Sequence, residues 1–284
     1  MTKRRLVLCV PHAAHVESRI PSMERLRGQI GNWPDPYIEI THKGPHWEWA
    51  MKLWEAGRDA CDGDPNSTFI TIQDDVTIPE NFYDVLQAVF TAVPDKIVAG
   101  LTPHAVAREI ARGGGRWMRT RSWILGNMYS IPGAMMPEFY DYAERNLASL
   151  RMTCEDQFTA RFCVETGRDT WHPLPSLVEH DTSVPSTWGA DDSMHRRAIV
   201  SFRNFDTKDM VRPDWWQPSG RVPLISEHLG PMCWGCFNEQ AAITYPSGMS
   251  LGANCAASFF ARVTQHLGAN PVHPAAMQAA QAGK

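Results

Sequence analysis

The stretch FITIQDDVTIPE, residues 69–80, contains an apolar run, two adjacent carboxylates and a Pro-Glu pair typical of a helix start. The β-branched and aromatic residues before Asp74 and Asp75 are typical of a buried strand. Pro79 suits the first turn of a following helix, where its missing N–H costs nothing. The stretch therefore predicts a strand, a turn and a helix, with two like charges at the turn.

The sequence on both sides of this stretch repeats the pattern of strand followed by helix. We expect strands over residues 5–12, 37–41, 68–73 and 96–102, and helices over residues 15–31, 46–61 and 79–93, the first broken at Pro21. Such alternation predicts an α/β fold with a mostly parallel sheet covered by helices on both faces. Ligands of such sheets bind beyond the carboxyl ends of the strands, where Asp74 and Asp75 are expected.

The rest of the chain is less regular. Residues 104–122 hold three consecutive glycines and five arginines, which predicts a mobile loop. Helices are expected from about residue 137 and over 154–167, and an extended segment over 170–180. We expect one α/β domain over residues 1–190 and a C-terminal extension over 191–284 that packs on it and ends in a tail-like segment.

Composition excludes several classes of protein. Hydrophobic residues make up 43% of the 284 residues and charged residues 20%, which is typical of globular proteins and excludes a disordered or fibrous chain. The net charge of −4 gives no general attraction to nucleic acid or to a membrane surface. No apolar run suits a membrane span or an export signal, so we expect a cytoplasmic protein whose seven cysteines are reduced thiols.

The paired acids Asp74 and Asp75 have two interpretations. Aspartate is common in turns because it accepts hydrogen bonds from nearby backbone N–H groups. Two adjacent carboxylates repel each other, however, and a divalent cation with its bound phosphates would neutralise them. Local sequence leaves both interpretations open.

A second acidic pair, Glu155 and Asp156, opens a predicted helix. Thr153 followed by these acids fits a capping box, which is a purely structural role. In a catalytic role, one carboxylate would act as a general base toward an acceptor proton. His180 is by itself most often a surface or core histidine, and its functional interpretation is that of a metal ligand.

Four segments in this order resemble glycosyltransferases of the GT-A fold: FITIQDDV, WILGNMYSIPG, CEDQFTARFCVETG and PLPSLVEHDTSVPSTWG. The resemblance implies a Rossmann-like sheet and transfer of a sugar from a nucleoside-diphosphate sugar, with Mn²⁺ or Mg²⁺ as cofactor. It implies Asp75, Asp74 and His180 as metal ligands and Asp156, or else Glu155, as the catalytic base. It places the nucleotide sugar near Pro11, His12, Arg19, Gln73, Asp74, Gly126 and Asn127.

Two details of the resemblance bear on chemistry. Gln73 departs from the commonest form of the motif, which starts with an acid, and this weakens the charge compensation of a metal. An acid at the base position favours inversion at the anomeric carbon, although retaining members have similar metal motifs.

The arginines of the chain suggest an acceptor. We expect acceptor contacts from Arg116, Arg119, Arg121 and Trp188, although a solvated charged face is the default interpretation of such residues. An anionic acceptor would fit, and related enzymes of bacterial viruses modify hydroxymethylated pyrimidines in DNA. A hydroxyl group of a protein or a small molecule is about as compatible with the sequence.

Three further hypotheses remain open. Cys233 and Cys236, with His228 and Cys255, could bind a structural Zn²⁺, although buried free thiols are common. A metal-dependent phosphoesterase or nuclease could hold two cations on the two acidic pairs. A non-catalytic module that binds sugar or nucleic acid would use the acids only as caps.

Overall fold

The computed structural model describes residues 3–41, 44–103, 106–120, 126–151, 153–181, 184, 198–225, 243–244 and 250–251. The chain divides into two compact units, Met1–Leu224 and Ile225–Lys284. The boundary expected at residue 190 lies among residues outside the described part, and the first unit continues to Leu224. In the second unit, strands β10 (Ile243–Thr244) and β11 (Ser250–Leu251) form an antiparallel pair.

The first unit is built on a seven-stranded sheet with the order β2-β1-β3-β7-β5-β8-β6. The strands are β1 (Arg5–His12), β2 (Tyr37–Thr41), β3 (Ser67–Ile72), β5 (Ile97–Ala99), β6 (Trp117–Thr120), β7 (Met128–Pro132) and β8 (Thr170–Pro173). Strands β7 and β6 run antiparallel to their neighbours, and the other five strands share one direction. The predicted α/β class with a mostly parallel sheet is confirmed.

Burial along β1 alternates between the two faces of the sheet. Leu6, Leu8 and Val10 belong to one apolar cluster, whereas Val7 and Cys9 belong to a second one. Since successive side chains of a strand point to opposite faces, each face needs its own cover. The uninterrupted apolar run LVLCV is therefore the sequence signal of a strand buried on both sides.

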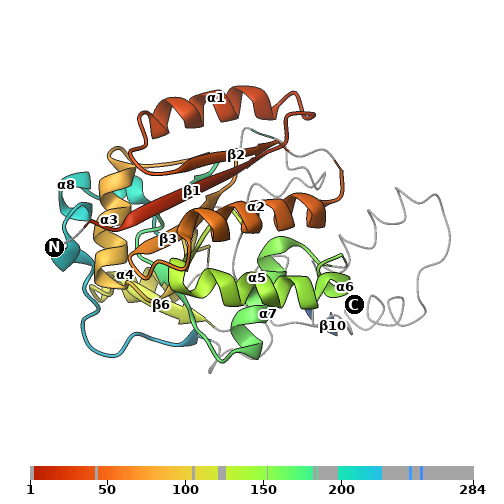
Figure 1. Ribbon diagram of the computed structural model, residues 1–284. Helices are drawn as coiled ribbons and strands as arrows, with labels where there is room; N and C mark the ends of the chain where they lie inside the picture. The colour runs from red at the N-terminus through yellow and green to blue at the C-terminus, as the bar shows by residue number, and fades with distance from the viewer. Residues whose placement is uncertain are drawn as a thin grey trace, which may run out of the picture. The chain divides into compact units, whose positions relative to one another are not determined.

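Helices cover both faces, as the sequence predicted (Figure 1). One cluster joins the sheet to α1 (Arg19–Ile30), α3 (Phe82–Ala92), η2 (Phe202–Asn204), α8 (Thr207–Met210) and η3 (Pro213–Trp216). The other joins it to α2 (His46–Cys61), α5 (Met136–Arg145) and α7 (Glu155–Glu165), with the short η1 (Gly133–Met135) and α6 (Leu147–Leu150) nearby. Among the described residues, no helix is both long enough and apolar enough to cross a membrane.

The structure corrects two local predictions. The stretch 104–122, expected to be a mobile loop, contains α4 (Val106–Arg112) and β6. Trp117 of β6 is only 2% exposed and donates a hydrogen bond to the Trp216 carbonyl oxygen at 2.6 Å, so this part belongs to the core. Pro21 does not break α1, because it lies in the first turn, where a helix tolerates proline.

Candidate functional site

Strand pairing brings three predicted segments to one edge of the sheet. In the parallel pair β1 and β3, Cys9 lies opposite Thr71, so His12 and Asp74 leave the sheet side by side. Strand β7 starts at Met128 at the same edge, and the Gln73 N–H donates to the Asn127 carbonyl oxygen at 3.0 Å. This register explains why the segments after β3 and before β7 meet.

A two-stranded pair adds the fourth segment. Strand β4 (Val76–Thr77) pairs with β9 (Glu179–His180), with Val76 opposite His180. The Asp181 N–H also donates to the Asp75 carbonyl oxygen at 2.7 Å. His180 is thereby held against the acidic turn, although it lies 105 residues further along the chain.

The two aspartates form the centre of a buried charged cluster. Asp74 is 3% exposed and Asp75 is fully buried. His12 Nδ1 lies 2.9 Å from Asp74 Oδ2, which also accepts from the Ala13 N–H at 3.0 Å. Arg19 Nη1 lies 2.6 Å from both Asp74 Oδ1 and Asp75 Oδ2. His180 Nε2 lies 2.8 Å from Asp75 Oδ2.

These contacts do not fit the interpretation of Asp74 and Asp75 as local caps. The groups in contact with the Asp74 carboxylate come from β1, the turn after it and α1, between 55 and 62 residues away. Helix α3, which follows the acids, has Asn81 as its N-cap and no side-chain capping bond. The acids therefore hold separate elements of the fold together at the carboxyl ends of β1 and β3.

The second acidic pair adjoins the first through an amide cluster. Gln73 Nε2 lies 3.5 Å from Glu155 Oε1, and Asn127 Nδ2 lies 3.4 Å from Gln73 Oε1. The Gly126 N–H donates to Asp156 Oδ2 at 3.2 Å. Gln73, Gly126 and Asn127, expected at the nucleotide sugar, are therefore neighbours of Glu155 and Asp156, the expected catalytic acids.

The capping box considered for Thr153 is absent from the structure. The N-cap of α7 is Cys154, and no side chain caps the helix. The Thr153 hydroxyl donates instead to the Ser149 carbonyl oxygen at 3.1 Å. Glu155 and Asp156 still gain from the positive end of the helix dipole, but their side chains face the amide cluster.

Gly126 is confined by the groups around it. A Cβ atom added there would lie 3.0 Å from Glu155 Oε1, 3.1 Å from Gln73 Nε2 and 3.5 Å from Asp156 Oδ2. The glycine therefore lets the backbone approach both acids closely. This is a physical reason for glycine in the segment WILGN.

The predicted metal ligands come together, but their arrangement does not fit a divalent cation. Asp74, Asp75 and His180 are adjacent, as predicted. Arg19 Nη1, however, lies between the two carboxylates at 2.6 Å from each. Within the described part of the chain, no group of three or more histidine, cysteine, aspartate or glutamate side chains is arranged to hold a metal ion.

Two groups close to Glu155 and Asp156 are kept protonated. Burial, and then the neighbouring carboxylates, raise the pKa of the Cys154 thiol well above its ordinary value. Burial, and then Glu155, raise the pKa of the Tyr129 hydroxyl in the same direction. Cys154 is therefore a thiol at neutral pH and unsuited to be a nucleophile.

Sequence reasoning missed the contacts that close the edge on the α1 side. Arg25 Nη2 lies 2.5 Å from Asp181 Oδ2, next to His180. Arg19 was placed near the nucleotide, but its ion pairs with both aspartates were not foreseen. Arg25 lies six residues after Arg19, about 1.7 turns of helix, so the helical period alone does not place them on one side of α1.

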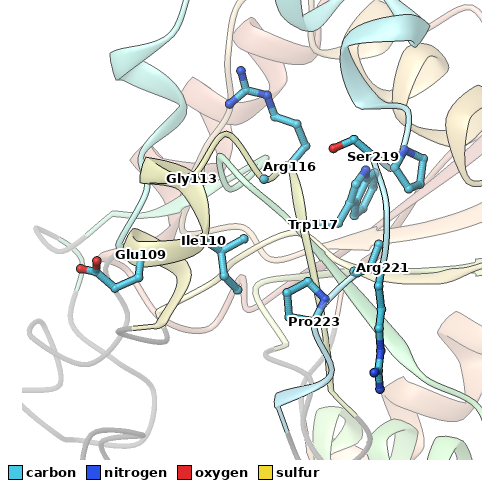
Figure 2. A pocket seen from close by; sticks show the side chains of 11 residues that line it. Glu109, Ile110, Gly113, Arg116, Trp117, Ser219, Arg221 and Pro223 are labelled. Atoms are coloured by element: carbon cyan, nitrogen blue, oxygen red, sulfur yellow. The ribbon is translucent and has the colours of Figure 1, made fainter.

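Pro11 lies buried in β1 just before His12. Of the expected acceptor residues, the described Arg116 and Arg119 lie away from this edge, at or beside β6. Arg119 is paired with Asp169 at 2.6 Å, and both Arg116 and Trp117 line a pocket of about 290 Å³ beside α4 and residues 218–223 (Figure 2). In Figure 2 the Arg116 side chain points away from Pro223.

Three strands separate β3 from β6, which is about 19 Å at the usual strand spacing, so this pocket is distinct from the acidic edge. The expected residues Arg121, Trp188, Cys233 and Cys236 lie outside the described residues, as do His228 and Cys255.

A comparison with models of protein families found none that matches this chain. A search of curated proteins also found no match. The geometry of the acidic edge is the observation that bears on function.

Proposed function

We propose that this chain is a GT-A-like glycosyltransferase that takes a sugar from a nucleoside-diphosphate sugar. One observation carries the proposal: described residues from the four segments that resemble this superfamily, up to 105 residues apart in sequence, meet at one edge of the sheet. That edge lies at the carboxyl ends of β1 and β3, where α/β folds bind nucleotides. The shared location also argues against the acids being unrelated local caps.

The groups near β1 suit the nucleotide side of a donor. His12 and the Ala13 N–H are fixed by Asp74, and Arg19 is fixed by both aspartates. Side chains held in this way lose little further freedom when a ligand binds. Departure of a nucleoside diphosphate builds negative charge, which positively charged or N–H groups of the protein can stabilise.

The groups near α7 suit the acceptor side. Asp156 is partly exposed, whereas Glu155 is buried at 8% exposure, so Asp156 is better placed to meet an acceptor hydroxyl. As a carboxylate it would remove the hydroxyl proton while the new glycosidic bond forms. The Gly126 N–H orients Asp156 Oδ2 for this role. A base that activates the acceptor favours inversion at the anomeric carbon.

The acceptor is proposed only as a hydroxyl group, with a hydroxymethylated pyrimidine of DNA as the first candidate to test. Arg116 contacts the rings of Trp215 and Phe205, with its guanidinium carbon 4.1 Å and 5.6 Å from their centroids. A partly buried arginine on aromatic rings suits contact with phosphate or a base. Its distance from the acidic edge would require an extended acceptor.

Donor binding is the first test. Thermal unfolding would be followed with UDP-, GDP- and other nucleotide sugars, each in EDTA and in Mn²⁺. A donor present at 100 times its dissociation constant stabilises the fold by about 2.7 kcal/mol. A shift with one nucleotide supports the proposal, and no shift with any of them contradicts it.

The base is tested by Asp156→Asn. We expect this change to keep the thermal shift with donor and to lower the transfer rate on the order of a hundredfold or more, because a general base contributes that much. Glu155→Gln is the matched control and should retain more activity. Transfer is measured as labelled sugar on the acceptor. Cleavage of a DNA acceptor without any donor would instead favour the phosphoesterase or nuclease hypothesis.

A further inference from the structure

The acidic edge already contains a cation of its own. Arg19, the first residue of α1, is 4% exposed, and its Nη1 atom lies 2.6 Å from one oxygen of each aspartate. The other Asp74 oxygen accepts from the Ala13 N–H and lies against His12 Nδ1. Three carboxylate oxygens of the pair are thus in contact with groups of the protein.

A divalent cation would compete with this arrangement. Metal ions of this kind bind carboxylate oxygens at about 2.0–2.6 Å, and Arg19 Nη1 already contacts one oxygen of each carboxylate, Asp74 Oδ1 and Asp75 Oδ2. An ion bound there would lie within a few ångströms of the guanidinium, whose charge it would repel. An arginine side chain keeps its charge at any ordinary pH, so loss of a proton would not relieve this repulsion.

His180 occupies the same Asp75 oxygen as Arg19 does. Its Nε2 atom lies 2.8 Å from Asp75 Oδ2, which is the oxygen that also faces Arg19. Its Nδ1 atom is buried and has no hydrogen-bond partner among the described residues. Nε2, the ring nitrogen that faces the acids, is therefore already in contact with Asp75. Nδ1 lies on the other side of the ring and faces away from the acids.

We propose that Arg19 takes the place of the divalent cation at this site, and that the edge binds its nucleotide ligand without Mn²⁺ or Mg²⁺. The inference rests on the proposed function for the identity of the ligand. Arg19 is then a positioning residue: it balances one of the two negative charges of Asp74 and Asp75 and fixes α1 to the turn after β3. This departs from the metal dependence that the family resemblance implied.

Mn²⁺ alone tests the inference on the unmodified protein. The electron paramagnetic resonance signal of free Mn²⁺ is recorded as protein is added, with Asp75→Asn as the control for unrelated surface sites. We expect the wild-type protein and Asp75→Asn to leave the same fraction of Mn²⁺ free. One equivalent of Mn²⁺ bound by the wild-type protein and lost in Asp75→Asn would overturn the proposal.

Removal of the arginine tests the same inference from the opposite direction. Arg19→Ala removes the guanidinium, so we expect a lower unfolding temperature that Mn²⁺ partly restores in a saturable manner. Arg27→Ala is the matched control on α1, because Arg27 forms an exposed pair with Glu39. Its unfolding temperature should not respond to Mn²⁺. If the wild-type protein gains as much stability from Mn²⁺ as Arg19→Ala does, Arg19 does not replace the ion.

The donor screen separates this inference from the proposed function. Equal stabilisation by a nucleotide sugar in EDTA and in Mn²⁺ supports both. Stabilisation only in Mn²⁺ overturns the role of Arg19 and keeps the glycosyltransferase proposal. If no nucleotide sugar binds, the proposed function fails, and the Mn²⁺ titration still decides whether Arg19 is the resident cation.

Discussion

Asp75 shows how one residue can serve both the fold and the site. Its fully buried carboxylate is the shared partner of Arg19 and His180. We expect Asp75→Ala to lower the free energy of unfolding by about 1–3 kcal/mol, because buried Arg19 and His180 each lose a hydrogen-bond partner, although Arg19 keeps Asp74. Urea denaturation measures this.

The matched control is Asp59→Ala, which removes an exposed acid paired with Arg58. It should change stability by less than about 1 kcal/mol. Equal stability of Asp75→Ala and the wild-type protein would show that the cluster is not held by this carboxylate.

Gly126 tests the site without the replacement of a charged residue. The Cβ of Gly126→Ala would lie 3.0 Å from Glu155 Oε1 and 3.1 Å from Gln73 Nε2, so the acids or the backbone must move by a few tenths of an ångström. We expect transfer to fall by about tenfold to a hundredfold, since small displacements of catalytic groups are costly. Gly28→Ala, with no atom within 4 Å of its Cβ, is the control. Equal transfer rates would place Gly126 outside the site.

At the scale of elements, local pattern predicted most of the first half of the sheet. The helix expected over residues 46–61 is α2, and the strands expected over 5–12 and 37–41 are β1 and β2. Their apolar residues follow the period of the element they form. The edge strand β6 was missed because three glycines and several arginines outweighed the short apolar pair that begins at Trp117.

The site could be predicted only in part for a related reason. The acids, the glycine and His180 were identified from short motifs, and the structure brings them together. The ion pair between Arg19 and the aspartates spans 55 residues and depends on how α1 leaves β1. No local period carries that information, so the resident cation could not be predicted.

Helix α2 provides a test of how tightly the layers pack. A Cβ added at Gly57 would lie 2.2 Å from Cδ2 of Phe69 in β3, so α2 meets the sheet at this glycine. Gly57→Ala must displace α2 or the Phe69 ring, and we expect a loss of about 1–3 kcal/mol. Gly28→Ala in α1 should instead be neutral or stabilising. Chemical denaturation compares the two, and equal stability of both variants would contradict this account of the packing.

At the scale of the whole molecule, the two apolar clusters determine where charged side chains can lie around the central strands. Both faces of β1 and β3 are sealed by helices, so polar side chains collect where these strands end. The acidic pairs and their partners therefore form one site instead of several surface patches. The helices that cover the sheet also bury cysteine thiols.

Burial raises the pKa of both Cys61 and Cys163 to about 11, above the ordinary value of 9.0. The native state therefore holds these protons after the unfolded chain has lost them, so the free energy of unfolding falls as pH rises from 9 toward 11. Each thiol accounts for about 2–3 kcal/mol of that loss. Urea denaturation across this range should show the decline, with a shallower slope in the double variant Cys61→Ala/Cys163→Ala. An unchanged slope would assign the alkaline loss to other groups, such as the buried Tyr142.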